Sequence, residues 1–337
     1  MRAVCGKIRA LMAAALAVCL SAGAAAAAPT VLRFAGQVPV DQTATKLMYQ
    51  IAEEVKEKTN GRVEIKVYPA NQLGDYTLVY EELIRGTIDM AAISIPSQFD
   101  PRLELTYINC FVRDFAEAKK VFAQDGWLFK KMNELSARLG VRLLGFQVEG
   151  FIGIASTKPV HEPLNPNVDK DCLVRIPNMD VYKLGAEAMG YRTVTIPWVE
   201  VYTSMQSGVC DGVDGMATPA AYVNLKDVMK YWYQLNYSLE NFNYMMSERT
   251  WQKLAPEDRQ VIADACARVT EISIDLAQKD QEKYLELMRQ HGIQVFTYTP
   301  EELGPLFEAV SATWDKLGRK FTPELIAEFK KEYAPKK

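Results

Sequence analysis

Histidine is scarce in this chain of 337 residues, which has only two of them. His161 lies in a proline-rich loop and His291 at a predicted helix end, and neither is close in sequence to a plausible nucleophile. The sequence also has no glycine-rich phosphate-binding loop, no serine nucleophile elbow and no cluster of metal-ligating histidines. Asp211 and Asp214 flank glycines and are interpreted as turn and cap residues rather than as a carboxylate pair or a metal site. We therefore predict no catalytic residues, no bound metal and no cofactor.

Apolar runs long enough to cross a membrane are also missing beyond the N-terminus. Residues 1–28 resemble a secretory signal peptide, with three basic residues, a short apolar core from Ala10 to Leu20 and a run of small residues. We expect cleavage near Ala27 or Ala28 and export of the remaining chain to the periplasm. Cys19 faintly resembles the cysteine of a lipoprotein signal, but the valine before it fits poorly.

An excess of positive charge is absent as well. The net charge is −3, and loss of the three basic residues of the leader changes it to −6. Nucleic acids and anionic membrane surfaces attract basic proteins, so neither is expected as a partner.

Cysteine is limited to four residues after the leader, Cys110, Cys172, Cys210 and Cys266, and their spacing does not match a metal site. Four cysteines in an exported protein allow three disulfide pairings. Cys172 and Cys210 both begin predicted short strands, so they could lie close together. A chain of this length does not need a disulfide, and four buried thiols are the simpler expectation.

Strand and helix patterns alternate along the chain, which is typical of an α/β protein with parallel strands. The first series of predicted elements consists of a strand at 31–35, a helix at 47–55, a strand at 62–68, a helix with Asp75 as its N-cap and a strand at 88–95. The second series consists of a strand at 173–176, a helix at 179–190, a strand at 193–196 and a helix from 201 to 208. A further strand is predicted at 141–146, and Thr299 and Glu302 form a predicted capping box at the start of a later helix.

These two series predict two α/β domains, which we divide as 29–151 with 241–280 and 152–240 with 281–337. A helical pattern from Pro256 to His291 corresponds to about 50 Å, which is enough to lie across both domains. Ligands of parallel sheets bind at the carboxyl ends of strands, where the loops containing Gln37, Asp75 and Ser94 lie.

Arg175 is the strongest candidate for a binding residue, because it lies in a short apolar run that is typical of a buried strand. A buried arginine needs an anionic or hydrogen-bonding partner, and its planar fork suits a carboxylate. An internal ion pair with a nearby acid explains the residue equally well on residue type alone.

Four motifs, in order and covering nearly the whole chain after the leader, resemble the solute-binding proteins of TRAP (tripartite ATP-independent periplasmic) transporters, a DctP-like family. The motifs are Asn60–Val63 continuing through Tyr68-Pro69 to Gln72–Asp75, Gly86–Met90, Val174–Asn178, and Glu200–Tyr202 continuing to Gln206–Gly208 and Asp211-Gly212. The resemblance implies a two-domain periplasmic binding protein fold, with a long C-terminal helix spanning both domains and the ligand held between them.

The resemblance also implies roles for particular residues. Arg175 would pair with a carboxylate of a small organic acid, Asn178, Trp198 and the Asp75 loop would line the cleft, and Glu200 would help to fix its floor. A TRAP-type membrane permease, driven by an ion gradient, would then receive the ligand.

Two departures from the family pattern bear on the ligand. Gly215 and Met216 stand where the family often has Asn-Pro, and the crossing segment near Phe151 lacks an arginine found in some members. This favours a monocarboxylate with an apolar or aromatic part, whereas Glu149, if it faces the cleft, favours a ligand with an ammonium group. We count Glu149, Phe151, Gly215 and Met216 among the candidate ligand-binding residues. A ligand-sensing periplasmic module and an exported hydrolase are the alternative functions.

Overall fold

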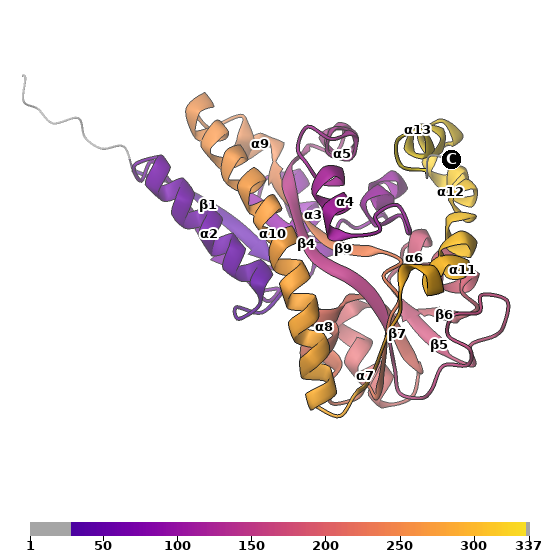
Figure 1. Cartoon of the computed structure of the whole chain (residues 1–337). Helices are drawn as coiled ribbons and strands as arrows, with labels where there is room; N and C mark the ends of the chain where they lie inside the picture. The colour runs from indigo at the N-terminus through magenta and orange to yellow at the C-terminus, as the bar shows by residue number, and fades with distance from the viewer. Residues whose placement is uncertain (1–27, 335–337) are drawn as a thin grey trace, which may run out of the picture.

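The computed structural model of the protein describes residues 28–334 (Figure 1). The predicted signal peptide and its cleavage lie almost wholly outside these residues. Within 28–334, no helix has both the length and the hydropathy needed to cross a bilayer.

The first lobe of the protein is built on three parallel strands, β1 (Thr30–Gly36), β2 (Val63–Tyr68) and β3 (Met90–Ile93). Strand β1 lies between β2 and β3. Helices α2 (Thr43–Lys58) and α3 (Tyr76–Arg85) connect the strands, as the sequence pattern predicts. Helix α2 buries a stripe that includes Leu47, Ile51 and Val55, because residues three and four positions apart share one helix face.

The second lobe repeats this arrangement with β5 (Leu173–Ile176), β6 (Arg192–Thr195) and β7 (Gly212–Ala217). Strand β5 lies between β6 and β7 and runs parallel to both. Helices α6 (Asp180–Ala188) and α7 (Val201–Gln206) provide the connections. The predicted strand–helix–strand order around Arg175 is therefore confirmed.

Two long antiparallel strands, β4 (Val141–Ser156) and β9 (Leu239–Ser247), join the lobes. The strand order is β2-β1-β3-β9-β4-β7-β5-β6, so the two crossing strands form the centre of one sheet. The sequence pattern predicts a strand only over 141–146, whereas the structure has a single strand of 16 residues. The division at 151/152 and 240/241 falls within β4 and β9 and remains a proposal.

Helix α10 (Pro256–Gln290) packs along β4 and contacts both α2 and α8 (Thr218–Leu225) (Figure 1). Its 35 residues correspond to about 50 Å, so the predicted spanning helix is confirmed. Gly145 of β4 permits this close packing, since a Cβ atom there would lie 2.6 Å from Thr270 Oγ1.

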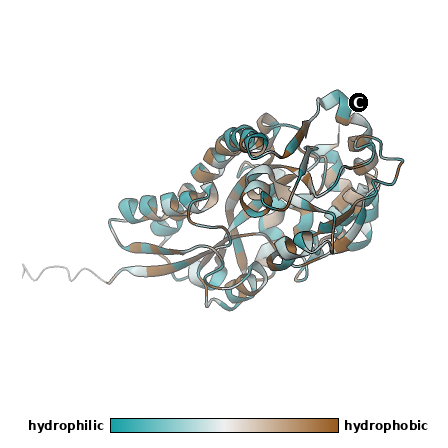
Figure 2. Ribbon diagram, turned by 90° about the horizontal axis from the view of Figure 1, so that it is seen from below, coloured by the Kyte–Doolittle hydropathy of each residue, from teal (hydrophilic) through white to brown (hydrophobic). Residues whose placement is uncertain are grey.

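The remaining elements cover the sheet and complete the lobes. They are the 3-10 helices Pro101–Tyr107 and Trp198–Glu200, α4 (Phe115–Val121), α5 (Trp127–Ala137), β8 (Tyr231–Gln234), α9 (Glu248–Trp251), β10 (Gln294–Thr297), α11 (Pro300–Ser311), α12 (Trp314–Phe321) and α13 (Pro323–Tyr333). The outer helices alternate hydrophilic and hydrophobic segments, as expected when one face of each helix packs inward (Figure 2).

The four cysteines of the described chain are buried free thiols. Cys172 Sγ lies 3.8 Å from Ser156 Oγ, and Cys172 is not bonded to Cys210. The simpler expectation from the sequence is thus confirmed over the disulfide alternative.

Candidate functional site

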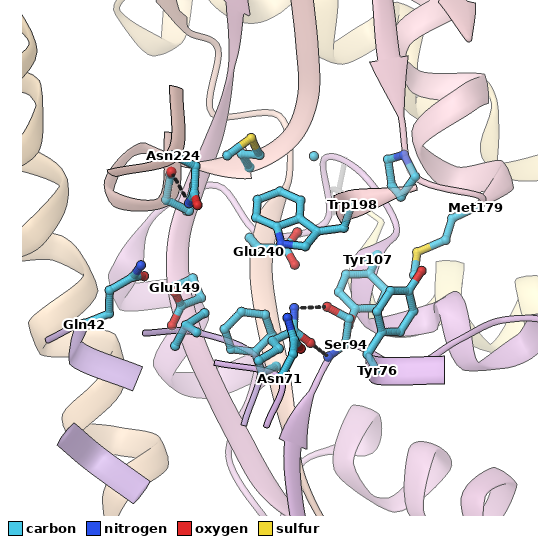
Figure 3. Close-up of a pocket in the computed structure, with 18 of the residues that line it drawn as sticks. Gln42, Asn71, Tyr76, Ser94, Tyr107, Glu149, Met179, Trp198, Asn224 and Glu240 are labelled. Carbon is cyan, nitrogen blue, oxygen red and sulfur yellow. Dashed lines mark hydrogen bonds between the residues drawn. The ribbon is translucent and has the colours of Figure 1, made fainter. Parts of the chain in front are cut away.

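A cavity of about 250 Å³ lies between the two lobes, against the crossing strands. Both lobes and both crossing strands contribute side chains to it (Figure 3). Its lining consists of Gln37, Val38, Pro39, Gln42, Ala70, Asn71, Tyr76, Ser94, Tyr107, Glu149, Arg175, Pro177, Met179, Tyr182, Trp198, Gly215, Met216, Ala217, Ala220, Asn224, Glu240 and Phe242.

Arg175 enters this cavity from β5, and its side chain is only 4% exposed. Its Nε donates to the Ile196 carbonyl oxygen at 2.9 Å, and one terminal nitrogen donates to the Asp214 carbonyl oxygen at 3.5 Å. Its Cζ lies 5.9 Å from the centroid of the Trp198 ring. Two backbone carbonyls thus fix the guanidinium group while several of its five N–H donors remain available.

Ion pairs within residues 28–334 do not include Arg175. The sequence alone left an internal ion pair as an equally good explanation of Arg175. This ion pair is not formed in the described chain. Burial lowers the pKa of Arg175, while Tyr76 and Asp214 oppose this shift. An arginine without a carboxylate partner, facing a cavity, can accept a ligand carboxylate through two N–H···O bonds.

Asp214 is predicted from the sequence to be a turn or cap residue, and this prediction is wrong. The side chain is fully buried in the middle of β7, where it accepts hydrogen bonds from Gly215 N at 2.6 Å and from the Tyr237 hydroxyl. Burial raises the pKa of Asp214 to about 7, and these hydrogen bonds oppose the rise. The Asp214 side chain therefore stabilises strand β7, in which the Asp214 carbonyl oxygen accepts a hydrogen bond from Arg175.

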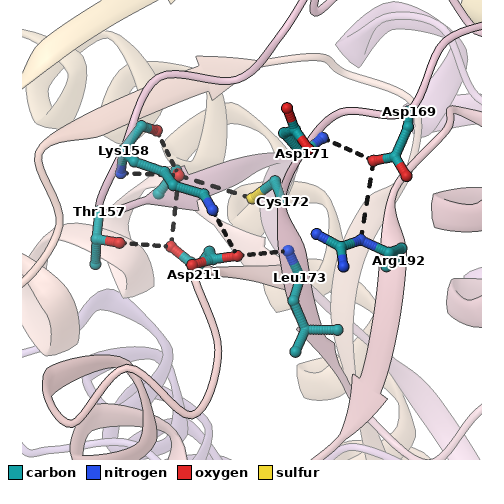
Figure 4. A network of polar contacts seen from close by, with 9 residues as sticks. Thr157, Lys158, Asp169, Asp171, Cys172, Leu173, Arg192 and Asp211 are labelled. Atoms are coloured by element: carbon teal, nitrogen blue, oxygen red, sulfur yellow. Dashed lines mark hydrogen bonds and ion pairs between the residues drawn. The ribbon is translucent and has the colours of Figure 1, made fainter.

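Asp211, by contrast, is a turn residue as predicted (Figure 4). Its carboxylate accepts from Leu173 N at 2.9 Å and pairs with Lys158 Nζ at 3.0 Å. Its carbonyl oxygen accepts from Thr157 N at 2.9 Å. This network ties the start of β7 to β5 and contributes no free group to the cavity.

Two carboxyl groups face the cavity from the crossing strands, Glu149 on β4 and Glu240 on β9. Glu240 Oε2 accepts a hydrogen bond of 2.6 Å from the Tyr182 hydroxyl. Burial raises the pKa of Glu240 to about 7. Burial, and then the nearby Glu240 and Asp280 carboxyls, raise the pKa of Glu149 to about 8.

Other predicted binding residues also line the cavity. Gln37 and Ser94 form a reciprocal pair across two strand ends, with Ser94 N donating to Gln37 Oε1 at 2.9 Å and Gln37 Nε2 donating to Ser94 Oγ at 3.4 Å (Figure 3). Trp198, Gly215 and Met216 form part of the wall in the second lobe.

Asn178 and Asp75 lie on an adjoining outer cavity that shares Arg175 and Trp198 with the first one. The Asp75 carboxylate caps α3 by accepting from Thr77 N at 2.9 Å and Leu78 N at 3.1 Å, as its predicted cap role requires. The Asn178 carbonyl oxygen accepts from Ser97 Oγ of the other lobe at 3.2 Å.

Glu200 and Phe151 are not part of the lining of either cavity, and their assignment to the site remains a prediction. Glu200 is exposed at the end of a 3-10 helix. Phe151 is buried against Phe115, with ring centroids 5.0 Å apart. A register shift between Val148 and Gly150 interrupts the alternation of β4, so Phe151 does not share the face of Glu149.

Sequence reasoning misses several lining residues, above all Glu240 and the tyrosines Tyr76, Tyr107 and Tyr182. Glu240 carries a weak signal, because it is the one acid in a strand whose other residues are apolar or neutral, as Arg175 is the one base in an apolar strand. The tyrosines carry no such signal, since a buried tyrosine is more often a core residue. Within 28–334, no group of three His, Cys, Asp or Glu residues is arranged to hold a metal ion.

Comparison with known proteins identifies one protein family over most of the chain. The family described as "Bacterial extracellular solute-binding protein, family 7" matches residues 34–320. The C4-dicarboxylate-binding periplasmic protein DctP of Rhodobacter capsulatus is 26% identical over 314 residues, which are 91% of this chain and 92% of the relative. The sialic acid-binding periplasmic protein SiaP of Vibrio cholerae is 24% identical over 294 residues, which are 86% and 89% of the two chains.

Solved structures show the same fold. A TRAP periplasmic solute-binding protein from Desulfovibrio salexigens with bound orotic acid has a TM-score of 0.81 at 22% identity, covering 90% of this chain and 98% of the other. A TRAP periplasmic solute-binding protein from Haemophilus influenzae with bound L-gulonate has a TM-score of 0.79 at 21% identity, covering 90% and 99%.

Proposed function

This chain belongs to the bacterial extracellular solute-binding proteins of family 7, and we propose that it captures a small organic acid in the periplasm and delivers it to a TRAP-type membrane permease. The ligand is a monocarboxylate with an apolar or aromatic part. The bound orotic acid and L-gulonate of the two structural relatives support an acid as the ligand class.

Arg175 is the single observation that carries this proposal. It is buried, held by the Ile196 and Asp214 carbonyls, and faces the cavity without an ion-pair partner in the described chain. Burying the Arg175 charge without a partner costs free energy. A ligand carboxylate would recover this free energy if both of its oxygens accept hydrogen bonds from the guanidinium N–H groups.

The apolar part of the ligand is inferred from the walls of the cavity. Trp198, Met179, Met216 and Phe242 offer apolar or aromatic surface, and Gly215 adds no side chain to the wall. Arg175 is the one cationic side chain in the lining, so a second carboxylate would have no counter-ion there. This combination supports a monocarboxylate over a dicarboxylate.

Ligand capture is expected to involve closure of the lobes around β4 and β9. The Ser97 to Asn178 hydrogen bond of 3.2 Å joins the two lobes at the mouth of the site. A ligand that contacts both lobes stabilises the closed state, because it gains contacts there that the open state lacks.

A thermal-shift screen against mono-, di- and keto-acids and aromatic acids tests this proposal. An acid present at 100 times its dissociation constant adds about 2.7 kcal/mol to the free energy of unfolding, which raises Tm. We expect such a rise with acids that combine one carboxylate and an apolar body. The absence of stabilisation by every acid in the panel contradicts the proposed function.

A further inference from the structure

The end of the cavity formed around Glu149 is polar and rich in acceptors. In Figure 3, Glu149 lies with Gln42 and Asn224 on one side, while Tyr76, Tyr107 and Met179 lie on the other. We call Gln42, Glu149 and Asn224 the polar corner. These three residues come from the first lobe, the crossing strand β4 and the second lobe respectively.

The polar groups of this corner are incompletely used by the protein. Gln42 is 7% exposed, and its Nε2 has no hydrogen-bond partner within residues 28–334. Glu149 receives one long hydrogen bond, from Gln147 Nε2 at 3.3 Å. Asn224 Nδ2 donates to the Ala220 carbonyl oxygen at 2.8 Å, which fixes the amide with its Oδ1 oxygen available as an acceptor.

The charges of the lining are also unbalanced. Arg175 is the single cation among the lining residues, whereas Glu149 and Glu240 are two carboxyl groups. Glu240 is engaged by the Tyr182 hydroxyl and interacts with Arg175, so Glu149 is the carboxyl without a partner of opposite charge. A carboxylate ligand alone adds negative charge to this cavity and so favours the protonated form of Glu149.

We propose that the polar corner binds a cationic nitrogen group of the ligand, so that the ligand is a zwitterion with its carboxylate on Arg175 and its ammonium on Glu149. The inference rests on the proposed function, because it assumes that Arg175 holds the carboxylate. An ammonium group has N–H donors that match the Glu149 carboxylate and Asn224 Oδ1, whereas the unpaired Gln42 Nε2 is a donor that an acceptor atom of the ligand would satisfy. The apolar body of the ligand would lie against Trp198 between these two ends.

Glu149 is suited to this role by its surroundings. Gln147 on β4, Glu240 on β9 and Asp280 on α10 are the groups that interact with it, and none of them is a cation. Asp280 is itself held by Thr43 Oγ1 at 2.6 Å. A ligand ammonium supplies the missing positive charge and favours the ionised carboxylate.

The test is calorimetric titration with matched pairs of acids that differ in one amino group. Aminovalerate with its amino group at the end of the chain opposite the carboxylate is compared with valerate, together with any acid found by thermal shift and its analogue with an amino group at the far end. We expect the amino-bearing member to bind roughly tenfold or more tightly, since one charge-assisted hydrogen bond is gained. Glu149→Gln should remove this preference for the amino-bearing acid.

Glu104→Gln is the matched control. Glu104 is also a buried carboxyl, 2% exposed, but it accepts from Val181 N at 3.1 Å and lies outside the cavity. This variant should keep the preference for the amino-bearing acid. Binding of plain acids with no gain from the amino group, or an unchanged preference in Glu149→Gln, overturns the inference and leaves the proposed function intact. Failure of every acid, with or without an amino group, overturns the proposed function instead.

Discussion

Replacing Arg175 with lysine keeps the positive charge but removes the planar fork that can hold a carboxylate through two parallel hydrogen bonds. The lysine ammonium can make one of these two bonds, so one charge-assisted bond, worth about 1.5–3 kcal/mol, is lost. This corresponds to a roughly 10- to 150-fold weaker affinity for the acid identified by the screen. Calorimetric titration of both proteins with that acid measures the difference.

Two features of the structure shape this experiment. Arg175 also donates to the Ile196 and Asp214 carbonyl oxygens, so the variant is expected to lose about 1–3 kcal/mol of folding stability. A melting curve of the unliganded variant therefore accompanies the titration. Arg142→Lys is the matched control, because the Arg142 fork binds Glu248 at 2.9 and 3.0 Å outside the cavity lining. Equal affinity in wild type and Arg175→Lys refutes the assignment of the carboxylate site.

Three further predictions follow from the same geometry. Trp198→Ala removes an aromatic wall beside Arg175 and should weaken acid binding by roughly tenfold, measured by titration, while a wild-type affinity shows that the ligand does not contact this wall. Gly215→Ala should lower the free energy of unfolding by about 1–3 kcal/mol in a denaturant titration, because the φ angle of Gly215 is +81° and the new Cβ would lie 3.1 Å from Pro177 Cδ. An unchanged denaturation midpoint contradicts this reasoning. In the unliganded protein, the pKa values of Glu149, Glu240 and Asp214 are raised to about 8, 7 and 7. The folded state therefore binds more protons than the unfolded state between about pH 4.5 and pH 8. Tm should fall as pH rises through this window, and the fall should be smaller in Glu149→Gln.

Much of the fold could be predicted because local patterns determine it. The apolar stripe of α2, the Asp75 cap of α3 and the capping box at Thr299 and Glu302 are signals carried by a few neighbouring residues. The full length of strand β4 was harder to predict, because Gly145, Gly150 and Gly153 interrupt its sequence pattern. In the structure these glycines allow close packing and register shifts within one continuous strand.

The candidate site was only partly predictable, because it is made by residues far apart in sequence. Arg175 could be identified from its own apolar strand, and Gln37 and Ser94 from their places at strand ends. The burial of Asp214 and the position of Glu240 beside Tyr182 depend on the pairing of β7, β4 and β9, which no local pattern encodes. Glu200 and Phe151 were assigned from a family resemblance and a nearby sequence position, and neither residue belongs to the lining of the two cavities.

The most direct measurement is a crystal structure of the protein with an acid that stabilises it. We expect the acid to occupy the cavity between the lobes, with its two carboxylate oxygens about 2.7–2.9 Å from guanidinium nitrogens of Arg175. A bound acid whose carboxylate lies elsewhere, with Arg175 still held only by the Ile196 and Asp214 carbonyls, would contradict it.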